Sequence, residues 1–134
     1  MVLVIGAILW LTIFSRDSLP EPEVRYKPFH SLENIVYNTK LYGIWSNLIG
    51  NILLFIPFGI LLPMASRWSN KWYRTLLVGF FMSLAVELVQ LITARGYFDY
   101  DDIVLNCAGA LTGFWIYQVL EKLFTKTDLN TADN

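Results

Sequence analysis

The sequence predicts an all-α integral membrane protein, a bundle of four transmembrane helices in a single domain. The 134-residue chain is 55% hydrophobic, and its mean hydropathy is +0.47. Only 16% of its residues are charged, whereas a typical soluble domain has about 25%. The apolar residues also gather in four stretches almost without charge, and three of these are long enough to cross a hydrocarbon core of about 30 Å as helices.

The first span is expected over residues 1–15, which are uncharged and almost wholly apolar. At 1.5 Å per residue this stretch reaches about 22 Å, which is short for a span. A signal peptide is the alternative, but neither a positively charged start nor a small-residue cleavage site is present. Residues 16–40 carry mixed charges and three prolines, so we expect an extramembrane loop there.

The remaining spans are expected at residues 45–64, 75–93 and 103–120. Pro57 lies inside the first of these three and removes one backbone hydrogen bond, so we expect a kink. The segment 127–134 is polar, and we expect it to be disordered.

The basic residues predict the orientation of the bundle. An even number of spans places both termini on one side, together with Arg67, Lys71 and Arg74 in one short turn. Lys122 and Lys126 follow the last span on that side. The opposite side has equally many basic residues, but most are diluted by acids in the long loop. Dense positive charge favours the cytoplasm, so both termini are predicted to be cytoplasmic.

Polar side chains are concentrated in the halves of three spans that face the hairpin at residues 95–102. Glu87 lies about six residues from the end of its span, hence roughly 9 Å deep, and shares a helix face with Gln90. A carboxylate inside a membrane helix is costly unless it is paired or hydrated, so it marks a functional site. We predict one polar intramembrane binding site formed by Asn47, Asn51, Glu87, Gln90, Arg95, Asp99, Asp102 and Asn106.

Two structural interpretations remain beside this one. Glu87 with Gln90 can serve as glue between helices, and the acidic hairpin can be a solvated turn in which Asp101 or Asp102 caps the last span. Small residues indicate where helices approach closely, because a glycine lets a neighbouring backbone come near. The residues expected to serve helix packing are Gly50, Pro57, Gly109 and Gly113.

Several function classes lack any signal in the sequence. The net charge is −1 and the basic residues only flank the spans, which argues against nucleic acid as a partner. The single His30 and the single Cys107 do not form a zinc pattern, so neither a metal nor another cofactor is expected. No nucleophile with a paired base is apparent, which weighs against an enzyme. Nothing in the sequence specifies the oligomeric state.

Four segments carry a resemblance to a known family. They are Y-K-P-F at 26–29, NLIGNILLFIPFGILLP at 47–63, ELVQ at 87–90 followed by R-x-x-x-D-x-x-D at 95–102, and N-x-x-G-x-x-x-G at 106–113. In order and spacing these segments resemble the VanZ-like family over about residues 26–120. The resemblance implies a multi-pass protein of the bacterial cell membrane, in a family named after an accessory protein linked to teicoplanin resistance. It assigns no catalytic residue, and the short first span departs from the family's pattern.

Three functions are compatible with these observations. The polar site can bind or modify an outer-leaflet lipid headgroup or a cell-wall precursor and thereby alter the access of lipoglycopeptides. It can instead be the centre of a membrane enzyme in which Glu87, Asp99 and Asp102 act as acid and base on a lipid-linked substrate. The third interpretation is a purely structural protein. An enzyme requires a cavity that reaches Glu87, whereas a structural role requires this carboxylate to be sealed and paired.

Overall fold

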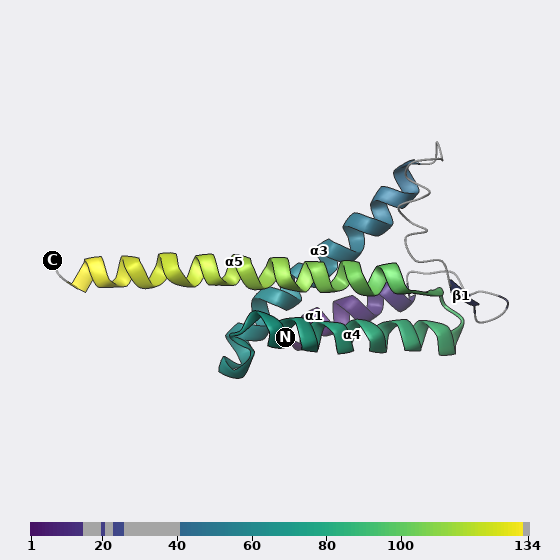
Figure 1. The fold of residues 1–134 in the computed structure, drawn as a ribbon, viewed down its shortest axis with the longest axis horizontal. Coiled ribbons are helices and arrows are strands. Elements are labelled where there is room, and N and C mark those ends of the chain that lie inside the picture. Colours follow the sequence, from purple (N-terminus) through teal and green to yellow (C-terminus); the bar gives the residue numbers. More distant parts are fainter. Residues whose placement is uncertain (15–19, 21–22, 26–40, 133–134) are drawn as a thin grey trace.

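The computed structural model describes residues 1–14, 20, 23–25 and 41–132, and it confirms an all-α membrane fold. Three helices are long and apolar enough to cross a membrane, and a shorter apolar helix lies at the start of the chain (Figure 1). The described elements, in chain order, are helix α1 (Val2–Leu9), π-helix η1 (Trp10–Phe14), strand β1 (Glu23–Arg25), helix α3 (Leu41–Ala65), 3-10 helix η2 (Arg67–Ser69), helix α4 (Trp72–Thr93), strand β2 (Tyr97–Asp99) and helix α5 (Tyr100–Ala132).

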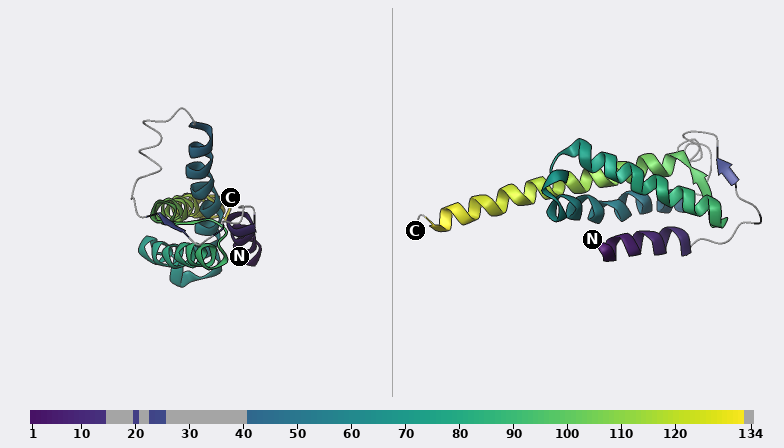
Figure 2. Two further views of the ribbon diagram at one scale, coloured as in Figure 1. Left: turned by 90° about the vertical axis from the view of Figure 1, so that its right-hand side faces the viewer. Right: turned by 90° about the horizontal axis from the view of Figure 1, so that it is seen from below.

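Helices α3 and α5 run in the same direction and form the tightest contact of the bundle. A Cβ atom added at Gly109 would overlap the carbonyl oxygen of Ile52, and one added at Gly113 would overlap that of Ile56. A move of four residues along α5 thus moves the contact four residues along α3, as expected for helices that run in the same direction. Helix α4 runs antiparallel beside α5, and α1 lies along the same bundle (Figure 2). The end of α4 and the start of α5 lie at one end, which we call the hairpin end, and the first turns of α3 project away from the bundle on that side (Figure 1).

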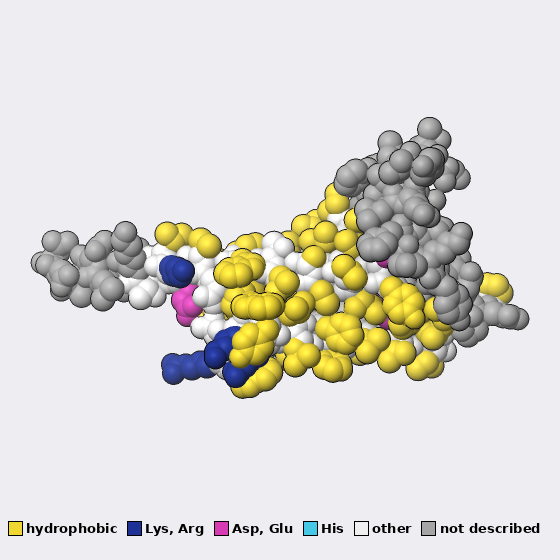
Figure 3. Space-filling view, viewed as in Figure 1, with side chains coloured by type: hydrophobic (Ala, Val, Ile, Leu, Met, Phe, Trp, Pro, Cys, Tyr) yellow, Lys and Arg dark blue, Asp and Glu magenta, His cyan; other side chains and the backbone are white. Residues whose placement is uncertain are grey.

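Aromatic and aliphatic side chains fill the space between the helices away from the hairpin end. Phe55 and Phe58 on α3 pack with their ring centroids 5.7 Å apart. They form the core with Ile8 of α1, Val86 of α4 and Ala110 of α5. The outer surface is also apolar, as expected for helices that face lipid, and hydrophobic side chains cover most of the middle of the molecule (Figure 3).

The helix boundaries differ from the predicted spans at several points. Helix α4 begins at Trp72 and α5 at Tyr100, each three residues earlier than expected. Helix α5 continues to Ala132 and projects beyond the other helices, through much of the tail that was expected to be disordered (Figure 1). No glycine or proline follows Gly113, so no helix-breaking residue interrupts α5 before Ala132. Tyr117 Oη also donates a hydrogen bond of 2.8 Å to Glu121 Oε1, one turn further on.

A short parallel β-ladder was not predicted. Strand β1, in the stretch expected to be an extramembrane loop, pairs with β2 in the register Glu23 to Tyr97, Val24 to Phe98 and Arg25 to Asp99. The pairing satisfies backbone groups of the hairpin, which would otherwise need water near the membrane. The similarity at residues 26–29 lies outside the described residues. Helix α3 continues through Pro57, whose side chain is exposed, and the kink expected there stays a prediction.

Candidate functional site

Six of the eight residues predicted to form the polar site are almost fully buried at the hairpin end. Glu87 and Gln90 on α4 are each 1% exposed. The side chain of Asn47 lies outside the described residues, and Arg95 is half-buried just past the end of α4. The other buried members of the predicted set are Asn51, Asp99, Asp102 and Asn106.

Two residues with positive φ turn the chain back over this site. Ala94, at φ 51°, ends α4 in the left-handed conformation, and its N–H is directed to the carbonyl oxygens of Gln90 and Leu91. Gly96 follows at φ 123°, a conformation that glycine adopts without steric cost. This reversal is short enough to bring strand β2 beside the last turns of α4.

The carboxylate of Glu87 holds the hairpin against α4. Its Oε2 atom accepts a hydrogen bond of 2.9 Å from the backbone N–H of Asp99. Asp99 directly precedes α5, and its Oδ1 atom accepts a hydrogen bond of 2.9 Å from the N–H of Asp101. Asp99 is therefore the N-cap of α5, in place of Asp101 or Asp102. These two residues lie in the first turn instead, where their negative charges stabilise the positive end of the helix dipole. Pairing of Arg95 with Glu87, which would offset the cost of a carboxylate inside the membrane, stays a prediction.

Gln90 connects α4 to the beginning of the chain. Its Nε2 atom donates a hydrogen bond of 2.8 Å to the backbone carbonyl of Thr12, which lies 78 residues earlier. Thr12 is in the π-helical turn η1, and its hydroxyl donates to the carbonyl of Ile8 at 2.6 Å. Sequence reasoning missed Thr12, because a threonine in an apolar stretch carries no signal of a distant partner.

Asn106 connects α5 to α4. Its Nδ2 atom donates a hydrogen bond of 2.9 Å to the hydroxyl of Ser83, which is fully buried. Ser83 was also missed, although a signal existed: it lies one helical turn before Glu87 and thus on the same face of α4. The buried face of this helix is almost entirely small or polar and consists of Thr75, Gly79, Ser83, Val86, Glu87 and Gln90.

Three buried amide atoms lack a hydrogen-bond partner within the described part of the chain. They are Nδ2 of Asn51, Oε1 of Gln90 and Oδ1 of Asn106. Leaving such a group without a partner costs about 1–3 kcal/mol, so buried polar atoms are normally satisfied. One is a donor and two are acceptors, so a group that both accepts and donates, such as a hydroxyl, an amide or a water molecule, can satisfy any of them.

The contacts place the amides of Asn51 and Asn106 near the same depth, whereas Gln90 lies two helical turns beyond Ser83 on α4, roughly 10 Å nearer the hairpin end. Ile52 follows Asn51 directly, and its carbonyl faces Gly109, which lies three residues after Asn106. Ser83 joins Asn106 to α4 one turn before Glu87. In the described residues no group of three or more His, Cys, Asp or Glu side chains is arranged to hold a metal ion.

The glycines at the helix contacts differ in part from the predicted set. Gly109 and Gly113 lie where α5 touches the backbone of α3, as described above. At Gly50 an added Cβ atom would meet nothing within 4 Å, so the described residues offer it no packing role. Gly59 has that role instead, because its added Cβ atom would overlap the backbone of Ala110.

Comparison with known proteins gives two matches. The model of the VanZ/LLP1 family matches residues 1–121. The Protein VanZ of Enterococcus faecium is 30% identical to this chain over 88 residues, which are 66% of this chain and 54% of that protein. The matched segment therefore spans about half the length of that relative. No solved structure is significantly similar.

Proposed function

Since the chain belongs to the VanZ/LLP1 family, we propose that its polar site binds the headgroup of an outer-leaflet lipid or a cell-wall precursor. With the predicted orientation, the hairpin end faces the outside of the bacterial cell. Occupation or modification of such an amphiphile would alter the access of lipoglycopeptides, whose acyl tails insert in that leaflet, and would contribute to teicoplanin resistance. The family resemblance supports the link to teicoplanin, and the chemistry of the site supports the ligand class.

The observation that carries the proposal is the set of three buried amide atoms without partners on Asn51, Gln90 and Asn106. If these side chains served only to join helices, their polar atoms would be hydrogen-bonded to other groups of the protein, because an unpaired polar atom in a lipid environment is costly. A sugar hydroxyl or a peptide amide supplies both a donor and an acceptor. Such groups are typical of glycolipid headgroups and of cell-wall precursors.

Glu87 is assigned a positioning role within this site. Its carboxylate is sealed from solvent and accepts the N–H of Asp99, and it thereby fixes the start of α5 and the depth of Asn106. Its described hydrogen bond is to the backbone of the hairpin, which favours a role in holding the site together over acid–base catalysis. The amide atoms without a described partner, on Asn51, Gln90 and Asn106, are the groups that would contact the ligand.

The variant Asn51→Leu tests the proposal sharply, because Asn51 Nδ2 donates to no described partner. Leucine keeps the branch at Cγ and removes both polar atoms of the amide. We expect the full-length protein to lose its co-purified polar lipid or precursor, measured by mass spectrometry of extracts, and cells to lose teicoplanin tolerance. The loss of one hydrogen bond corresponds to about 2–10-fold weaker binding.

Thr125→Val is the matched control, since the exposed Thr125 hydroxyl bonds only to the carbonyl of Glu121 among the described residues and lines no proposed site. It should leave both measurements unchanged. If Asn51→Leu instead raises thermal stability while the extract and the tolerance stay as in the wild type, the site is structural and the proposal is wrong.

A further inference from the structure

The end of the bundle opposite the polar site carries a groove between the beginning of α4 and the middle of α5. Its volume is about 340 Å³. It combines one cationic side chain, two amides and several aromatic rings. The lining residues are Asn70, Lys71, Trp72, Tyr73, Phe114, Trp115 and Gln118.

The walls of this groove are held in place by interactions within the turn between α3 and α4. Gln118 Nε2 on α5 donates a hydrogen bond to Asn70 Oδ1, which fixes the turn against α5. Arg74 Nη1 donates to the carbonyl of Trp68 at 3.0 Å, and its guanidinium lies 4.8 Å from the centre of the Trp68 ring. The same guanidinium lies 5.6 Å from the ring centre of Tyr73. A groove braced in this way needs little ordering when a ligand binds.

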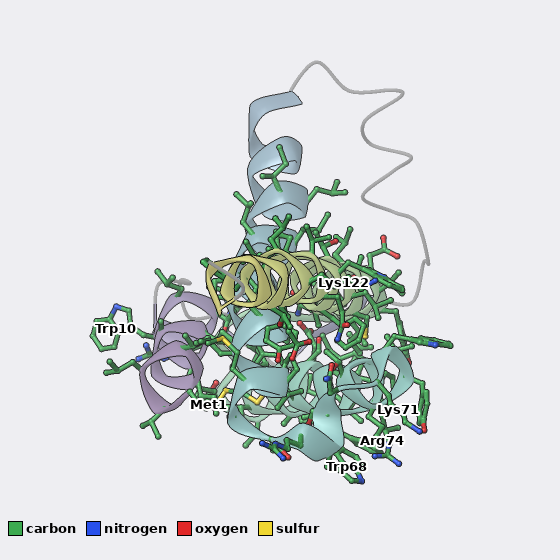
Figure 4. All side chains as sticks on the ribbon, turned by 90° about the vertical axis from the view of Figure 1, so that its left-hand side faces the viewer. Met1, Trp10, Trp68, Lys71, Arg74 and Lys122 are labelled. Carbon is green, nitrogen blue, oxygen red and sulfur yellow. The ribbon has the colours of Figure 1, made fainter. Side chains whose placement is uncertain are left out.

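The electrostatics of this end favour an anion. Residues 65–75 contain Arg67, Lys71 and Arg74 and no acidic residue, and the first turn of α4 has none either. Positive side chains beside the positive end of a helix dipole repel it, and an anion relieves this repulsion. Lys71, an exposed residue that immediately precedes α4, lines the groove itself. Lys71 and Arg74 lie together in Figure 4, whereas Lys122 lies apart from them on α5.

The surroundings of the groove favour a lipid over a soluble anion. Trp68, Trp72, Tyr73 and Trp115 are 46–58% exposed at this level, as in the aromatic belts at membrane interfaces. A second groove of about 420 Å³ lies on the exposed surface of α5 alone and shares Trp115 with the first. Four of its five lining residues are apolar or aromatic, as an acyl chain requires. The residues lining it are Thr112, Trp115, Ile116, Val119 and Leu120.

From these observations we propose that the two grooves form a binding site for an anionic phospholipid, with its phosphate at Lys71 and an acyl chain beside Ile116. The site is independent of the polar site at the hairpin end and shares no residue with it. With the predicted orientation it lies in the inner leaflet, whose surface is rich in anionic lipids. Its occupant would stabilise the turn between α3 and α4 and the exit of α5 from the bundle.

Native mass spectrometry of the delipidated full-length protein tests this site. The wild type, Lys71→Gln and Lys122→Gln are each titrated with phosphatidylglycerol, phosphatidylcholine or inorganic phosphate. Lys122→Gln is the matched control, because it removes the same charge from the same end but does not line the groove. We expect the wild type to prefer phosphatidylglycerol, and Lys71→Gln to weaken that binding about fivefold, the effect of one lysine near a membrane surface. Lys122→Gln should match the wild type.

Two outcomes would overturn the proposal. An equal loss in both lysine variants, or equal binding of phosphatidylglycerol and phosphatidylcholine, would mean that no specific headgroup site exists. Competition by inorganic phosphate as strong as that by the lipid would mean that the groove binds free anions instead. Both lysines are exposed, so we expect unchanged thermal unfolding in the variants. The amount of lipid or precursor held at Asn51 is measured separately, so failure here leaves the polar site unaffected.

Discussion

Gly59→Ala and Gly50→Ala make the same chemical change in the same helix, but the structure predicts opposite effects on stability. A methyl group at Gly59 would overlap the carbonyl oxygen of Ala110 and lie 2.8 and 2.9 Å from its carbonyl carbon and Cα. At Gly50 the methyl group would meet nothing within 4 Å. Backbone atoms of a neighbouring helix cannot rotate away as a side chain can, so α3 and α5 must separate.

The size of the difference follows from two terms. Replacing glycine by alanine inside a helix gains about 1 kcal/mol of helix propensity at either position, and this gain cancels in the comparison. Overpacking costs about 1–3 kcal/mol, and contact with backbone places Gly59→Ala at the upper end of this range. We therefore expect Gly59→Ala to be less stable than Gly50→Ala by about 3 kcal/mol.

The assay is reversible unfolding of the purified protein in mixed detergent and sodium dodecyl sulfate, followed by circular dichroism. Gly50→Ala should unfold at or above the wild-type midpoint, and Gly59→Ala well below it. Equal midpoints for the two variants would refute the close approach of α3 and α5 at Ala110. They would also remove the basis for placing Asn51 and Asn106 at one depth.

Three further predictions concern the hairpin end and the orientation. In a background without the native cysteine, Asn70→Cys should resist labelling from outside the cell and Tyr100→Cys should react, and the reverse pattern would invert the bundle. Asp99→Ala removes the N-cap of α5 and should lower the free energy of unfolding by about 0.5–2 kcal/mol, measured by the same denaturant titration; no change would show that the cap is unimportant. Under the proposed function, Glu87→Gln and Arg95→Ala should each lower teicoplanin tolerance, with the double variant little worse than either, whereas additive losses would show that the two side chains do not interact.

The sequence alone was sufficient to predict the all-α membrane fold. In a lipid environment, uncharged apolar stretches of about 20 residues satisfy their backbone groups by forming helices. The depth of polar side chains along each span was also readable, because a helix rises by 1.5 Å per residue. For this reason Glu87, Gln90 and Asn106 were placed at one end, where the structure has them buried.

Only the tertiary structure decided which groups meet. A helical period says which residues share a face, but it does not determine how far each helix is rotated or shifted against its neighbours. Gln90 therefore bonds to Thr12, Asn106 to Ser83, and Glu87 to a backbone N–H of the hairpin, none of which the sequence specified. The same freedom explains why Gly59 rather than Gly50 lies at the closest approach of α3 to α5.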